Sequence, residues 1–167
     1  RRAAGGGGAG NRRQIMKGGQ SQQFLAQTLT ELVQARRHLD YSFAQVATLP
    51  DDLGNVTAGQ LESVEAFCSR FARTVDLLVN KALRSLDRVE LKPEGTLLDV
   101  VNRAEKRGFI TRAADLREMK DVRNIIAHDY AGAKAAEIFA WCREQKPVLD
   151  ATCDHLATYA TQLLSAK

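Results

Sequence analysis

The stretch TRAADLREMKDVRNIIAHDY, residues 111–130, decides the fold class of this chain. Its apolar residues recur at helical spacing, so that one side faces a core at Met119, Val122 and Ile126. No Pro or Gly interrupts the run, and Gly132 follows it. The pattern predicts an amphipathic helix from Thr111 to about Tyr130 that packs on other helices.

The segments beside this helix are also helical in pattern. Before it, a break at Pro93 precedes a short predicted helix over residues 94–106, which Gly108 suits as a C-terminal cap. After it, residues 134–164 form the last predicted helix. Pro147 is expected to kink or divide that helix, because proline lacks a backbone donor and clashes with the preceding turn.

Two longer helices precede these segments. Residues 21–47 carry a near-heptad apolar stripe, and residues 49–55 form a loop. Thr57 and Gln60 have the spacing of a capping box, which opens a second helix through about Asp87. Five helices with short connections and no strand pattern predict an all-α fold, an antiparallel bundle of four to five helices.

The chain divides into a short leader and one domain. Residues 1–20 are rich in Gly and Arg without apolar periodicity, and we expect them to be disordered. Residues 1–15 are expected to precede a natural start at Met16; a disordered RNA-binding arm is the alternative. Residues 21–167 are expected to form one helical domain. No run of about 18 apolar residues and no secretory signal occurs, which predicts a cytoplasmic protein without a membrane span.

The net charge of +4 arises in the leader. Residues 1–20 contain five basic and no acidic residues, so residues 21–167 hold 19 basic and 20 acidic ones. Contact with a nucleic acid would therefore need a local patch of cations. Three cysteines without paired short spacing argue against a disulfide framework or a zinc site, and Cys68, Cys142 and Cys153 are expected to be small buried residues.

The last part of the opening stretch carries the chemistry. Arg123 offers a planar fork of donors for a phosphate, and His128 can move a proton near neutral pH. That pair suffices for metal-free cleavage of RNA, in which the 2′-hydroxyl of the substrate is the nucleophile. Asn124 and, less directly, Asp121 are candidates to orient the imidazole or contact the phosphate.

The residues from Arg123 to Tyr130 resemble the Arg-x4-His-x-Tyr signature of HEPN domains, in particular HepT-like toxins. A polar residue after the Arg, here Asn124, is also similar to that family. The resemblance implies a HEPN-like dimeric bundle with RNA as the substrate of an endoribonuclease toxin, and catalysis by Arg123 and His128 without a cofactor. It also implies a cognate minimal nucleotidyltransferase antitoxin that transfers AMP onto Tyr130.

The helical register raises a geometric question. On a regular helix Asp121, Asn124 and His128 form one polar stripe, whereas Arg123 points about 140° away from His128. One straight helix therefore does not bring both groups onto one phosphate. Either the helix ends or bends near His128, or two chains assemble the site, as in the composite cleft of HEPN dimers.

Other interpretations stay open. A polar stripe is commonly a solvated face, and the bundle could be a non-catalytic partner that presents substrate to a nucleotidyltransferase. A DNA-binding regulator has the least support, because no basic recognition helix is evident. On the second helix, acidic residues could pair with Arg70 and Arg73, or simply be solvated; the acidic residues are Glu62, Glu65 and Asp76. Trp141 is expected to anchor helices or a dimer seam.

Overall fold

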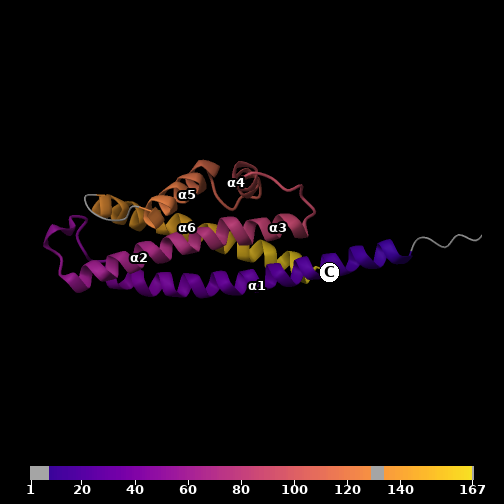
Figure 1. Ribbon diagram of the computed structural model, residues 1–167, viewed down its shortest axis with the longest axis horizontal. Helices are drawn as coiled ribbons and strands as arrows, with labels where there is room; N and C mark the ends of the chain where they lie inside the picture. Colours follow the sequence, from indigo (N-terminus) through magenta and orange to yellow (C-terminus); the bar gives the residue numbers. More distant parts are fainter. Residues whose placement is uncertain (1–7, 129–133, 167) are drawn as a thin grey trace, which may run out of the picture.

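A computed structural model describes residues 8–128 and 134–166. Across these ranges the chain forms helices and turns without a strand, which confirms the predicted all-α fold (Figure 1). The elements are α1 (Gly8–Val46), the 3₁₀ turn η1 (Leu53–Asn55), α2 (Ala58–Asp76), the π-helical segment η2 (Leu77–Leu83), α3 (Arg84–Val89), α4 (Leu97–Lys106), α5 (Ala113–His128) and α6 (Lys134–Ser165).

Helix α1 begins earlier than predicted. Residues 8–20 are helical rather than disordered, and the side chains of residues 10–20 are all exposed. Figure 1 shows this part of α1, drawn in indigo, extending beyond the rest of the bundle. Once a helix has nucleated, each added residue gains a hydrogen bond at low cost, so the packed part of α1 can extend without burying apolar groups.

The second predicted helix is confirmed as one helical run from residue 58 to 89, comprising α2, η2 and α3. The predicted capping box at its start is formed. The amide of Gln60 donates to the Thr57 hydroxyl, and the Thr57 amide donates to Oε1 of Gln60. The π-helical turns at Leu77–Leu83 had no counterpart in the sequence prediction. Such insertions re-aim the side chains that follow them and often lie at functional sites.

The remaining helices have bounds close to those expected. Gly108 has a φ of 78°, a left-handed conformation that favours glycine, and it follows α4 as predicted. Helix α6 runs without division through Pro147, so of the two predicted effects, a kink or a division, the division was wrong. Pro147 is exposed, and the carbonyl group that loses its partner can bind water on that side.

Every helix from α1 to α6 contributes buried side chains to the core. Phe67 is fully buried and makes edge-to-face contacts with Phe71 and Phe139, at centroid distances of 6.5 and 6.1 Å. All three cysteines are buried, as predicted. Burial raises the pKa of the Cys153 thiol to about 12, which keeps it protonated at neutral pH.

Candidate functional site

Helix α5 carries the predicted site and packs against α2 and α4. Met119 is fully buried and Val122 and Ile126 are partly buried, which confirms the predicted core face. Ile125 lies at its margin with 38% of its surface exposed. The polar residues of the same helix consequently point away from the core.

Arg123 is held by a carboxylate of α2. Its Nε donates to Oδ2 of Asp76 over 2.7 Å, and its Nη2 lies 2.5 Å from the same oxygen. The other oxygen, Oδ1, accepts from Nζ of Lys120 at 2.8 Å and from Nδ2 of Asn80 at 3.2 Å. Asp76, the last residue of α2, thus binds two cations on successive turns of α5.

We call Asp76, Asn80, Lys120 and Arg123 the Asp76 cluster. Two cations face one carboxylate, so the cluster retains a net positive charge. The Arg123 side chain is still 31% exposed, which leaves its guanidinium reachable from solvent. A fixed, partly exposed guanidinium beside an ammonium group is suited to bind a phosphate.

Asn124 is brought to the same place. Its Oδ1 accepts from Nη1 of Arg123 at 3.1 Å, and its side chain is exposed. The carboxamide therefore orients the third nitrogen of the guanidinium. The predicted roles of Asn124, to orient the imidazole or to contact the phosphate, stay predictions.

His128 is the last residue of α5 and is exposed. Because the helix continues to that residue, His128 lies about 7.5 Å along the axis from Arg123 and about 140° around it. Within residues 8–128 and 134–166 no side-chain hydrogen bond joins His128 to Arg123 or Asn124. Asp121 is exposed and makes no polar contact with a described residue. Tyr130 lies outside the described residues.

The sequence did not reveal how helix two contributes. The suggested pairing of Asp76 with Arg70 or Arg73 was wrong, because Asp76 contacts α5 instead. Arg70 donates to α1, to the His38 carbonyl at 3.1 Å and the Ser42 hydroxyl at 2.5 Å. Lys120 and Arg123 are three residues apart on α5, and this spacing of two cations is a sequence signal that could have indicated an acidic partner.

Trp141 lies between helices, as one of its two predicted roles required. Its Nε1 donates to Oε1 of Glu118 on α5 at 3.2 Å, and its ring meets Phe71 of α2 edge-on at 5.9 Å. The start of α6 is therefore fixed against the two helices that build the Asp76 cluster.

Two kinds of feature are absent from the described part of the chain. It contains no group of three or more His, Cys, Asp or Glu residues arranged to hold a metal ion. None of the helices described combines the length and apolar character needed to span a bilayer.

Comparison with known proteins gives one family match. The family model described as "Ribonuclease HepT-like" matches residues 58–156, which include α2 to α5, the Asp76 cluster and most of α6. No curated protein and no solved structure matches the chain significantly.

Proposed function

Because the chain belongs to the HepT-like ribonuclease family, we propose that it is a metal-independent endoribonuclease acting as the toxin of a toxin–antitoxin pair. The observation that carries this proposal is the guanidinium of Arg123, which Asp76 of α2 holds in place. Arg123 lies on α5, the helix that ends at His128. The family match supports a ribonuclease with a HEPN-type bundle. The residue roles below rest on the geometry and on acid–base chemistry.

The proposed reaction is a transesterification within the RNA. The 2′-oxygen attacks the adjacent phosphorus, and the bond from phosphorus to the 5′-oxygen of the next nucleotide breaks. His128 takes the proton of the 2′-hydroxyl or gives a proton to the leaving 5′-oxygen, and water supplies or takes up the other proton. The products are a 2′,3′-cyclic phosphate and a 5′-hydroxyl, and no bound cofactor is needed.

Arg123 stabilises the negative charge that grows on the phosphoryl oxygens. A donor that is already positioned costs little reorganisation when that charge develops. Asp76 supplies this positioning through Nε and Nη2, and Asn124 through Nη1. Lys120, whose side chain is 12% exposed, adds a second positive charge at the other oxygen of the Asp76 carboxylate.

Two copies of the chain are proposed to form each active centre. Arg123 and His128 diverge on one α5, so a single copy does not direct both at one phosphate. A twofold axis beside α5 would bring the Arg123 of one copy towards the His128 of the other.

Tyr130 is the proposed site of control. A cognate nucleotidyltransferase antitoxin would transfer AMP from ATP onto its phenol with release of pyrophosphate, and the added phosphate would compete for Arg123 and repel RNA. Co-expression with such a partner should add one AMP-sized mass to the chain and none to Tyr130→Phe. An adduct that persists in Tyr130→Phe would contradict this assignment.

The chemistry of the cut ends tests the proposed reaction. Purified protein should leave 2′,3′-cyclic phosphate and 5′-hydroxyl termini on an RNA oligonucleotide, as read by mass spectrometry. A 2′-O-methyl group at the cleaved nucleotide should block the cut, because the nucleophile is removed. Termini with 5′-phosphate would contradict the transesterification. A protein that binds RNA without any cleavage would favour the non-catalytic partner of a nucleotidyltransferase.

A further inference from the structure

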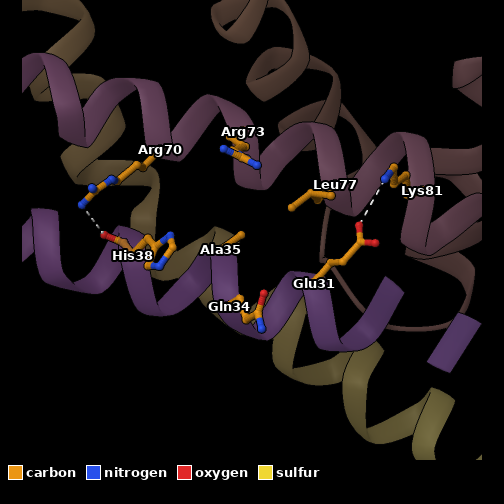
Figure 2. Close-up of a pocket in the computed structure, with 8 residues that line it drawn as sticks. All are labelled: Glu31, Gln34, Ala35, His38, Arg70, Arg73, Leu77 and Lys81. Carbon is orange, nitrogen blue, oxygen red and sulfur yellow. Dashed lines mark hydrogen bonds and ion pairs between the residues drawn. The ribbon is translucent and has the colours of Figure 1, made fainter. Parts of the chain in front are cut away.

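A second basic feature lies on the flank of α2 next to the Asp76 cluster. Between α1 and α2 is a groove with a volume of about 340 Å³, which we call the α1–α2 groove (Figure 2). Its lining consists of Glu31, Gln34, Ala35, His38, Arg70, Arg73, Leu77 and Lys81. Three permanent cations therefore face one carboxylate in a surface depression of a domain that is otherwise nearly neutral.

The cations of the groove differ in how they are held. Arg70 is fixed by its hydrogen bonds to α1, as Figure 2 shows for the His38 carbonyl. Lys81 pairs with Glu31 at 3.1 Å, but both side chains are substantially exposed, at 49% and 36%. Arg73 is exposed and has no ion pair with a described residue. The exposed pair of Lys81 and Glu31 is weak, so Lys81 can exchange Glu31 for an incoming anion.

The α1–α2 groove adjoins the Asp76 cluster. Arg73 and Asp76 are three residues apart on α2, so their side chains are neighbours on one helix surface. Leu77 lines the groove and directly follows Asp76. The groove and the cluster therefore lie on adjacent flanks of the same turns of α2, with Arg73 between Arg70 and Asp76 in the chain.

We propose that the α1–α2 groove binds the phosphodiester backbone of single-stranded RNA next to the nucleotide that is cleaved. This inference rests on the proposed function and adds a binding site to it. Residues 21–167 carry no excess of positive charge, so a local set of cations has to attract the substrate. The α1–α2 groove provides such a set beside Arg123.

Features of the lining favour backbone contact over recognition of a base. No Phe, Tyr or Trp of the described ranges 8–128 and 134–166 lines the groove, so these residues offer no aromatic platform on which a base stacks. The cations span Arg70 to Lys81, about 16 Å along the helix, which is long enough to meet more than one phosphate. Recognition should consequently be insensitive to sequence and sensitive to salt.

Binding to an RNA that cannot be cut tests this site apart from catalysis. The probe is a fluorescent 2′-O-methyl oligonucleotide of about 12 nucleotides, within the usual range of single-strand sites. Its affinity is measured for the wild-type protein and single variants at several salt concentrations. Arg73→Gln should weaken binding about fivefold, the upper range for one exposed ion pair, and lower the salt slope by about 0.7.

Two further variants sharpen the result. Glu31→Gln removes the carboxylate of the lining and releases Lys81, so binding should become tighter, which mere loss of structure would not produce. Arg112→Gln is the matched control, since Arg112 is 70% exposed and lies outside the groove and the Asp76 cluster. It should bind the probe like the wild type.

The outcomes separate the groove from the proposed nuclease. Equal affinity of wild type, Arg73→Gln and Glu31→Gln would overturn the groove as an RNA site, even if the wild type cleaves RNA. An Arg73→Gln variant that binds RNA normally but loses binding to a protein partner would overturn it too. Changes in the expected directions would support the groove, and they would do so even if wild-type protein failed to cut unmodified RNA.

Discussion

The pairing of Arg123 with Asp76 gives the candidate site its rigidity. The two residues are 47 positions apart in the sequence, and the contact exists because α5 packs against the end of α2. An unpaired arginine would sample many rotamers before it met a phosphate. Asp76 is therefore a positioning residue for the cation that stabilises the transition state.

Removing the charge of Asp76 should lower catalysis more than stability. In Asp76→Asn we expect kcat for RNA cleavage to fall about tenfold or more, because Arg123 and Lys120 lose their common anchor. The free energy of unfolding should fall by about 1 kcal/mol or less, as for partly exposed ion pairs. Steady-state kinetics and urea unfolding measure the two quantities.

Asp115→Asn provides the control for that experiment. Like Asp76, Asp115 is a partly exposed carboxylate that pairs with an arginine, here Arg112. Asp115 lies in the first turn of α5, at the end of the helix away from Arg123. It should leave kcat unchanged. A loss of kcat in both variants, or in neither, would contradict a specific role for Asp76.

The sequence predicted Arg123, Asn124 and His128 because they lie within one short pattern. It did not predict Asp76 as the partner of Arg123, because that contact depends on the packing of two helices. The π-helical turns after Asp76 also lack a sequence signal, since they exchange one hydrogen-bond register for another among ordinary helix-forming residues. The sequence therefore predicted the residues of the local motif, but it did not predict their tertiary contacts.

At the helix ends too, features set by neighbouring residues were predicted, and features set by packing elsewhere were not. The capping box at Thr57 and the left-handed Gly108 depend on neighbouring residues, and both were predicted. The helical state of residues 8–20 was not predicted, because it continues a helix that is stabilised by packing further along. Continuity through Pro147 likewise follows from the stability of the whole of α6.

A buried ionic network ties the end of α3 to α4 and α6. Arg107 lies 2.6 Å from Oδ1 of Asp87 and 2.6 Å from Oε2 of Glu90, and Arg103 lies 3.0 Å from Asp87. The Tyr159 hydroxyl donates to Glu90. Burial opposes ionisation of Glu90, but the hydrogen bonds from Tyr159 and Arg107 outweigh it, so the pKa of Glu90 lies below its usual value.

This network should make stability depend on pH in the acidic range. A carboxyl group whose pKa is lowered by folding stabilises the native state above its unfolded pKa of about 4.3. That contribution is lost as the pH falls through the lower, folded pKa. Glu90→Gln should therefore unfold more easily than wild type at pH 7, and the difference should shrink towards pH 3. Urea unfolding at both pH values measures it, and a difference independent of pH would contradict the account.

The assembly of two chains determines whether Arg123 and His128 can act together. If each centre takes its arginine from one copy and its histidine from the other, mixing Arg123→Ala with His128→Ala should create one intact centre in every mixed dimer. With random exchange of subunits, activity should recover to about a quarter of the wild-type value. No recovery in verified mixed dimers would show that the two residues act from the same copy.

Cleavage of total RNA by the purified, unmodified protein in EDTA, beside His128→Ala, tests the central claim most directly. Wild-type protein should cut despite the chelator, and His128→Ala should cut about 10²-fold more slowly or worse, because the proton-transferring group is gone. Cleavage that EDTA abolishes, or a His128→Ala variant that cuts at the wild-type rate, would contradict a metal-independent nuclease built on His128.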